Sequence, residues 1–263
     1  MSNLENKLKK IVNTFNSINK EEGYRDIKKL SEKYKKNIKV LNVLSQISQK
    51  MGDIDTALNS LKKILLIENN NIDLLSKIYK LCLIKSSLDE ALEYIDTILR
   101  IDKVHYESTR DKAYIYFLKN NFNNAKKYID KISKLKENDF FAYNIKGLIY
   151  LKNNILYEAK DYFEQAIEIN NKHVDSYNNL GVCLLELEKL NEAYKIFKEA
   201  HEIDSNNTKT LINLGNVLSL QDNILEAIKV YNKALALDAN NQEILSNIAI
   251  CYCREGKDKE AKI

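Results

Sequence analysis

The chain has 263 residues, with 41 Lys and Arg against 37 Asp and Glu, so its formal net charge is only +4. A chain this close to charge balance lacks the basic excess that is typical of nucleic-acid-binding proteins, and no apolar run approaches the ~20 residues that a membrane span requires. The N-terminal segment MSNLENKLKK lacks the apolar core of a signal peptide.

An alanine recurs every 34 residues along the chain, without any insertion or deletion. The column consists of Ala57, Ala91, Ala125, Ala159, Ala193, Ala227 and Ala261, and Gly23 lies one period before it. A fixed period of this length is typical of stacked supersecondary units rather than of one closed globule. The period favours a binding scaffold, because no comparable pattern in the sequence indicates catalysis.

Each unit is predicted to be a pair of amphipathic helices, because further apolar columns follow the alanine column at spacings of three and four residues. In most units the first helix also carries a small residue, such as Gly181, which lets the two helices of a pair approach closely. We expect a single array whose units cover residues 4–37, 38–71, 72–105, 106–139, 140–173, 174–207 and 208–241, with a truncated eighth unit at 242–263.

The two halves of the chain differ in charge and in core composition. Residues 1–139 contain 27 Lys and Arg against 19 Asp and Glu, whereas residues 140–263 contain 14 against 18. Upstream, two core columns pair aliphatic residues, as in Ile129 with Ile132, and downstream they pair an aromatic residue with alanine, as in Phe163 with Ala166. Two interpretations remain open: drift among the repeats, or contact of the two halves with different partners or with different ends of one partner.

The sixth unit shows most clearly which family the repeats resemble. Its columns are Tyr177, Leu180, Gly181, Leu184, Ala193, Phe197 and Ala200. They resemble the pattern of the tetratricopeptide repeat (TPR), and the resemblance extends over nearly the whole chain. It implies an all-α fold, a right-handed superhelical solenoid of 34-residue helix-turn-helix repeats.

The sequence departs from this pattern in two ways. It contains no proline, so Asn-Asn pairs at 170–171, 206–207 and 240–241 are expected to provide the turns and helix caps. In addition, Tyr79 stands in a column where a small residue is expected.

The resemblance further implies that the first helices line a concave surface that binds peptide segments. On the face of these helices opposite the packing columns lie the basic residues Lys77, Lys80 and Arg110, the apolar residues Tyr114, Phe117, Phe141, Leu148 and Val182, and the asparagines Asn144, Asn178, Asn179, Asn213, Asn216 and Asn247. An asparagine amide offers both a donor and an acceptor to a peptide group of a ligand, but local hydrogen bonding explains this column equally well. The apolar residues suit hydrophobic side chains of a partner, and the cations suit acidic groups. Packing between first helices is the alternative for the apolar residues, and we expect it for Leu151 and Leu185.

No catalytic residue, cofactor or metal site is predicted. The motifs of nucleotide-binding loops, serine hydrolases and zinc peptidases are absent from the sequence. His105 and His173 lie two units apart and cannot readily share a metal ion or a proton. Cys82, Cys183 and Cys251 fall on apolar columns, where a free thiol behaves as a small hydrophobic group. A reducing cytoplasm is therefore the expected location.

We therefore predict a non-catalytic protein-protein interaction scaffold that binds peptide or protein segments in its concave groove, with neither nucleic acid nor membrane as a partner. Two alternatives remain, namely the TPR arm of a larger enzyme or regulator and a self-associating assembly module. The carboxylate clamp of chaperone-binding family members is incomplete here, because the series that starts at Asn178 meets Glu243, which repels a carboxylate. The truncated eighth unit fits either a piece of a longer protein or a first helix that caps the array. The identity of the partner and the oligomeric state cannot be inferred from the sequence.

Overall fold

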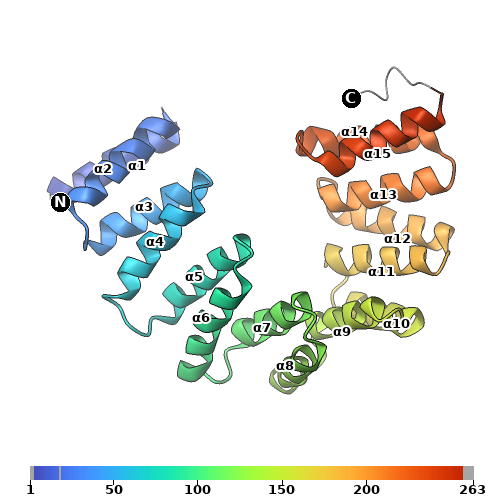
Figure 1. The fold of residues 1–263 in the computed structure, drawn as a ribbon, viewed down its shortest axis with the longest axis horizontal. Coiled ribbons are helices and arrows are strands. Elements are labelled where there is room, and N and C mark those ends of the chain that lie inside the picture. Colours follow the sequence, from blue (N-terminus) through green and yellow to red (C-terminus); the bar gives the residue numbers. More distant parts are fainter. Residues whose placement is uncertain (1–2, 18, 257–263) are drawn as a thin grey trace. The chain divides into compact units, whose positions relative to one another are not determined.

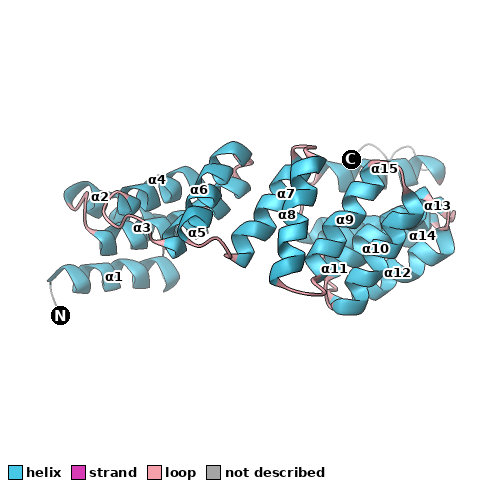
Figure 2. Ribbon diagram, turned by 90° about the horizontal axis from the view of Figure 1, so that it is seen from below, coloured by secondary structure: helices cyan, strands magenta, loops and turns pink. Residues whose placement is uncertain are grey.

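The computed structural model describes residues 3–17 and 19–256, which form fifteen α-helices and no strand (Figure 1). Short loops connect the helices (Figure 2). The predicted all-α solenoid of helical pairs is thereby confirmed. The second helix expected for the eighth unit, with Ala261, lies outside the described residues.

The helices form two series that alternate along the chain. The first helices of the repeats are α1 (Asn3–Ser17), α3 (Ile38–Lys50), α5 (Ile72–Ile84), α7 (Tyr106–Leu118), α9 (Phe140–Lys152), α11 (Val174–Glu186), α13 (Thr208–Leu220) and α15 (Gln242–Arg254). The second helices are α2 (Lys20–Lys33), α4 (Ile54–Leu65), α6 (Leu88–Ile101), α8 (Phe122–Leu135), α10 (Leu156–Ile169), α12 (Leu190–Ile203) and α14 (Ile224–Leu237). From α3 onward, each series starts a new helix every 34 residues.

Asparagine side chains cap several of the first helices. The Oδ1 atoms of Asn207 and Asn241 accept hydrogen bonds from backbone N–H groups in the first turns of α13 and α15, at 3.0 and 3.2 Å. Each bond satisfies one N–H group that has no partner inside the helix, so the capping expected of these two Asn-Asn pairs is confirmed. At the pair 170–171, Asn170 instead accepts from the N–H of Lys172 at 3.2 Å, and α11 begins after His173.

A left-handed backbone conformation ends every first helix from α3 to α15. The residues with positive φ at this place, spaced by 34, are Gly52, Ser86, Asn120, Asn154, Glu188, Asp222 and Gly256. Glycine and asparagine adopt this conformation most easily at the end of a helix. Glu188, with φ of 59°, therefore costs about 1 kcal/mol of stability that a glycine at the same place avoids.

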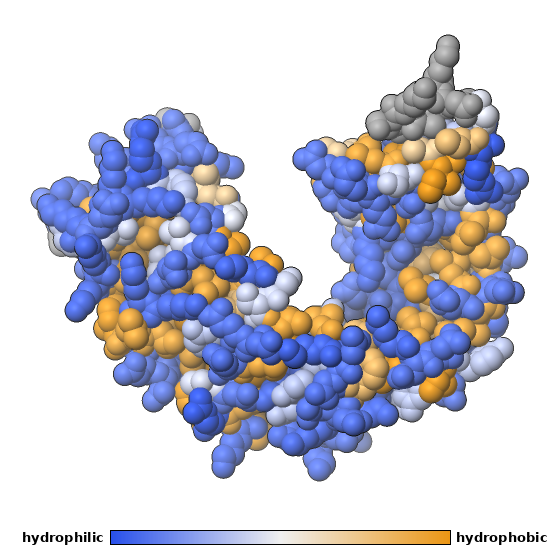
Figure 3. Space-filling model, in the orientation of Figure 1, coloured by the Kyte–Doolittle hydropathy of each residue, from blue (hydrophilic) through white to orange (hydrophobic). Residues whose placement is uncertain are grey.

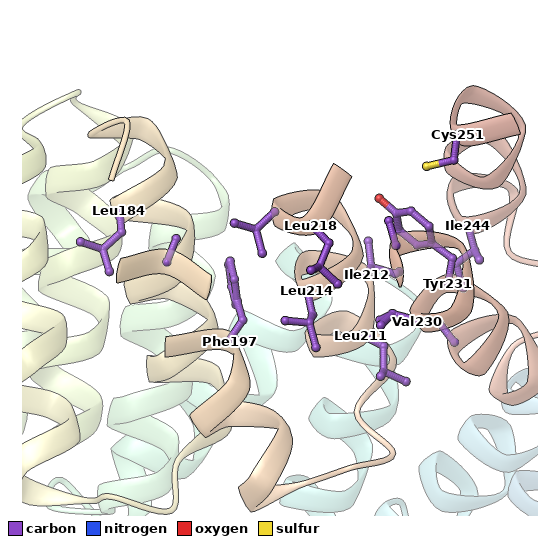
Figure 4. Packing of buried hydrophobic residues seen from close by; sticks show 14 of the residues in the cluster. Leu184, Phe197, Leu211, Ile212, Leu214, Leu218, Val230, Tyr231, Ile244 and Cys251 are labelled. Atoms are coloured by element: carbon purple, nitrogen blue, oxygen red, sulfur yellow. The ribbon is translucent and has the colours of Figure 1, made fainter. Parts of the chain in front are cut away.

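The chain divides into two compact parts, residues 1–115 and 116–263, which we name the N-terminal part and the C-terminal part. The core of the C-terminal part centres on buried aromatic rings from the second helices, namely Phe163, Phe197 and Tyr231. Figure 4 shows the rings of Phe197 and Tyr231 lying among aliphatic side chains of the neighbouring helices. Cys183 and Cys251 are buried in the same core, and Cys82 is buried in that of the N-terminal part, as their apolar columns predicted.

The third repeat takes its aromatic ring from the other helix of the pair. Tyr79 of α5 occupies the column that holds glycine in α9, α11 and α13, and its side chain is fully buried. Its hydroxyl donates a hydrogen bond to Oδ2 of Asp111 at 2.9 Å. The facing column on α6 holds Ile95 rather than an aromatic residue. Burial and the charge of Asp111 raise the pKa of Tyr79, so the hydroxyl remains a proton donor at neutral pH.

Candidate functional site

The first helices of the C-terminal part form one layer. Helix α11 contacts both α9 and α13, and α13 in turn contacts α15. Figure 3 shows apolar patches between polar residues on the visible surface of this part. Two neighbouring hollows open where the last turns of these helices meet, and they contain five of the predicted site residues.

The first of them, named here the apolar hollow, has a volume of about 410 Å³. Its lining consists of Phe117, Leu148, Leu151, Lys152, Asn154, Leu156, Val182 and Glu186. Phe117, Leu148 and Val182 are predicted site residues, and the structure brings them together. Because most of the lining is aliphatic or aromatic, a hydrophobic side chain of a partner that is fully buried here contributes about 1.5–3 kcal/mol.

The second, named here the acidic hollow, has a volume of about 570 Å³. It is lined by Leu185, Glu186, Glu188, Asn216, Ser219, Leu220, Tyr231, Asn247 and Ile250. Asn216 and Asn247 are predicted site residues. Glu186 lines both hollows, which therefore adjoin each other. The lining includes two carboxylates and no lysine or arginine, so the electrostatic potential of this hollow favours a cation.

The asparagines of α9 and α11 are engaged within the protein. Asn178 is 0% exposed, its Nδ2 donates to Oγ1 of Thr210 at 2.9 Å, and its Oδ1 accepts from Nδ2 of Asn213 at 3.4 Å. Asn144 is also buried, and its Oδ1 accepts from Nδ2 of Asn179 at 3.1 Å. These bonds join successive repeats, which is the local hydrogen bonding that we considered as the alternative. Asn144, Asn178 and Asn179 are all buried, which removes them from the predicted contact surface.

Asn216 and Asn247 are linked in the same way but remain more accessible. Nδ2 of Asn247 donates to Oδ1 of Asn216 at 3.1 Å, and the hydroxyl of Tyr231 donates to the same oxygen at 2.6 Å. Both asparagines are only partly buried and line the acidic hollow. Burial raises the pKa of Tyr231, so its hydroxyl stays protonated and keeps Asn216 oriented.

Replacing Asn178 with alanine is expected to lower the free energy of unfolding of the C-terminal part by about 1–3 kcal/mol. The substitution leaves the buried hydroxyl of Thr210 and the amide of Asn213 without their shared partner. Urea unfolding monitored by circular dichroism measures the effect, with Asn232→Ala on the exposed face of α14 as the control. Equal stability of the two variants would contradict a structural role for Asn178.

The remaining predicted residues do not join this site. Lys77, Lys80, Arg110 and Tyr114 belong to the N-terminal part. Nζ of Lys80 pairs with Oε2 of Glu107 at 3.0 Å, and this hydrogen bond lowers the pKa of the Glu107 carboxyl. Arg110 donates to Oδ1 of Asp111 from both Nε and Nη2, at 2.8 and 2.7 Å. Tyr114 is 38% exposed.

Phe141 and several residues that line the hollows differ from the prediction. Phe141 is half-buried on α9 and lies outside both hollows. The hollows add Glu186, Glu188 and Leu220, none of which falls on the helix face from which the site was predicted. A sequence signal for Glu188 existed, because glycine or asparagine occupies its column in most other repeats.

Other kinds of site were also sought in the described part of the chain. It contains no group of three or more His, Cys, Asp or Glu side chains that could hold a metal ion. None of the described helices combines the length and the apolar character needed to cross a membrane.

Paired helices at a fixed period, with hollows along the layer of first helices, define a helical-repeat solenoid. Models of the tetratricopeptide repeat match residues 38–71 and 173–240, and a model described as anaphase-promoting complex, cyclosome, subunit 3 matches residues 118–200. The chain belongs to the tetratricopeptide repeat family. No curated protein sequence matches it significantly.

Solved structures with the same fold are numerous. A tetratricopeptide repeat protein from Parabacteroides merdae ATCC 43184 aligns with a TM-score of 0.76 and 18% identity, over 94% of this chain and 98% of its own. Yeast Tom70 aligns with a TM-score of 0.70 and 18% identity, over 96% of this chain and 53% of its own. Pseudomonas aeruginosa pilF aligns with a TM-score of 0.60 and 14% identity, over 72% of this chain and 86% of its own. At these low sequence identities, the similarity shows a shared fold and nothing about function.

Proposed function

We propose that the chain is a non-catalytic protein-interaction scaffold, and that its C-terminal part binds a short extended segment of a partner protein across the two hollows. The observation that supports this proposal most directly is the adjacency of the apolar and acidic hollows on one layer of first helices. Stacked helical repeats commonly bind their partners on such extended surfaces.

The two hollows suit neighbouring side chains of one peptide. An apolar side chain enters between Leu148 and Val182, while the polar groups of Asn216 and Asn247 lie farther along the same layer. Ordering a flexible segment offsets much of the contact free energy, so a dissociation constant on the order of micromolar is expected.

The proposal is tested with a peptide selected on the chain itself. A random peptide library displayed on phage is panned against the protein, and the strongest selected sequence is synthesised with a fluorescent label. The double variant Leu148→Ala/Val182→Ala is expected to bind this peptide about tenfold more weakly, because it removes apolar contact area from the hollow. Fluorescence anisotropy measures the affinity.

The matched control is the double variant Tyr157→Ala/Leu225→Ala, which truncates apolar residues that are 67% and 57% exposed on second helices. It is expected to bind like the wild type, and melting curves check that both variants are folded. Equal affinity of the two double variants would overturn the proposed site. Dimers seen by light scattering and broken by Leu148→Ala/Val182→Ala would instead identify a second copy of the chain as the occupant.

A further inference from the structure

The end of α13 shows how this chain binds a guanidinium group. Nη1 of Arg254, at the end of α15, donates to the backbone carbonyl oxygen and to Oγ of Ser219, both at 2.8 Å. Nη2 of the same residue donates to Oδ1 of Asp222 at 2.9 Å. The carbonyl oxygen lies at the negative end of the helix dipole, and the carboxylate adds a full charge, so both attract a cation.

The backbone geometry and a carboxylate, but not the serine hydroxyl, recur one repeat earlier without the cation. Thirty-four residues before Ser219 and Asp222 stand Leu185 and Glu188, and the residue in the column of Arg254 is Leu220. Asp222 and Glu188 both have positive φ, at 65° and 59°, so the backbone has the same conformation at the ends of α13 and α11. The carbonyl oxygen of Leu185 accepts from the N–H of Glu188 at 2.9 Å, as that of Ser219 accepts from Asp222 at 3.1 Å.

Among the described residues, no lysine or arginine lines the acidic hollow, although Lys152 lines the adjoining apolar hollow beside Glu186 and Arg254 contacts Ser219. Within the described ranges, neither Glu186 nor Glu188 forms an ion pair, and the adjacent Lys189 pairs with Glu192 at 3.2 Å. In place of a cation the hollow presents the aliphatic side chains of Leu220 and Ile250, which are 59% and 56% exposed. A negatively charged rim beside exposed aliphatic surface matches a side chain with an apolar stem and a cationic end.

We propose that the acidic hollow binds an arginine side chain of the partner segment. Its guanidinium group contacts Glu188 and the carbonyl oxygen of Leu185, in the way that Arg254 contacts Asp222 and Ser219, and its stem lies on Leu220 and Ile250. This inference rests on the proposed function and specifies its ligand as a peptide with an apolar residue for the apolar hollow and an arginine nearby. The backbone strain at Glu188 fits such a role, because a glycine there would be more stable but would provide no charge.

Arginine fits better than lysine for a geometric reason. A guanidinium group is planar and presents several N–H donors at once, so it can reach a carboxylate and a carbonyl oxygen together, as Arg254 does. An ammonium group can contact one of them well but matches the pair less closely. An acidic peptide is repelled by Glu186 and Glu188.

The test compares two forms of one selected peptide. In the second form citrulline replaces arginine, which keeps the shape of the side chain and removes its charge. The wild-type chain is expected to bind the arginine form about tenfold more tightly, whereas Glu188→Gln is expected to bind both forms alike. Glu199→Gln, on the exposed face of α12, serves as the matched control and keeps the tenfold preference.

A second variant supplies the missing cation from within the chain. Leu220→Arg places an arginine in the column of Arg254, where it is expected to pair with Glu188 and to abolish the preference for the arginine peptide. Anisotropy titrations measure both effects on the intact chain, and melting curves confirm that the variant is folded.

The outcomes separate this inference from the proposed function. Two results would contradict the inference alone if Leu148→Ala/Val182→Ala still weakens binding. They are selected peptides that lack arginine, and equal affinity of the wild type for the arginine and citrulline forms. If that double variant also leaves binding unchanged, or if no peptide is selected, both proposals fail.

Discussion

The replacement of Tyr79 with alanine is expected to lower the free energy of unfolding of the N-terminal part by about 3–5 kcal/mol. The side chain is 0% exposed and packs in a core of aliphatic residues, so its removal leaves a cavity that the surrounding helices can fill only in part. It also removes the hydroxyl that donates to the buried carboxylate of Asp111. Urea unfolding gives the size of the effect, and hydrogen exchange with mass spectrometry shows whether α5 and α6 lose protection.

Two companion variants divide this effect between the ring and the hydroxyl. Tyr79→Phe keeps the ring, and Asp111 keeps its bonds to Arg110, so a loss of only about 1–3 kcal/mol is expected. The double variant Tyr79→Gly/Ile95→Phe moves the ring to the second helix, as in the later repeats, and is expected to be more stable than Tyr79→Gly alone. A destabilisation below about 1 kcal/mol for Tyr79→Ala would show that the ring contributes little packing.

The fold follows from the sequence because the packing columns recur without interruption. Close approach of two helices requires a small residue such as Ala193, and seven such positions in register indicate which face of each helix packs. Neither the turn residues nor the divergent early repeats disturb this frame. Even Tyr79, which breaks the small-residue column, is accommodated by a smaller residue at Ile95 in the facing column.

The site was harder to predict because a helix face does not reveal which neighbour covers it. Asn178 and Asn216 both lie on first helices and both bond to the next repeat, but Asn178 is fully buried, whereas Asn216 borders a hollow. The two asparagines occupy different columns, the fifth and the ninth residue of their units, so they face different parts of the following helix. The position of Glu188 depends on a backbone turn that lies beyond the helix, where periodicity of three and four residues gives no information.

The replacement of Gly181 with valine is expected to lower the free energy of unfolding of the C-terminal part by about 3 kcal/mol. A Cβ atom at this position would lie closer than 3.0 Å to three ring carbon atoms of Phe197. Phe197 is fully buried in the core cluster, where its ring lies among aliphatic side chains that hinder its movement (Figure 4). The added volume must therefore separate α11 from α12. Urea unfolding of the variant measures the loss.

Truncation of the facing ring is expected to relieve this strain. In Gly181→Val/Phe197→Ala the valine occupies part of the space that the ring vacates, so the double variant is expected to lose at least about 1 kcal/mol less than the sum of its two single variants. The third repeat already contains such an exchange, since Tyr79 faces Ile95 there. If the double variant instead loses as much free energy of unfolding as the two single variants together, contact with Phe197 is not the reason why residue 181 must be small.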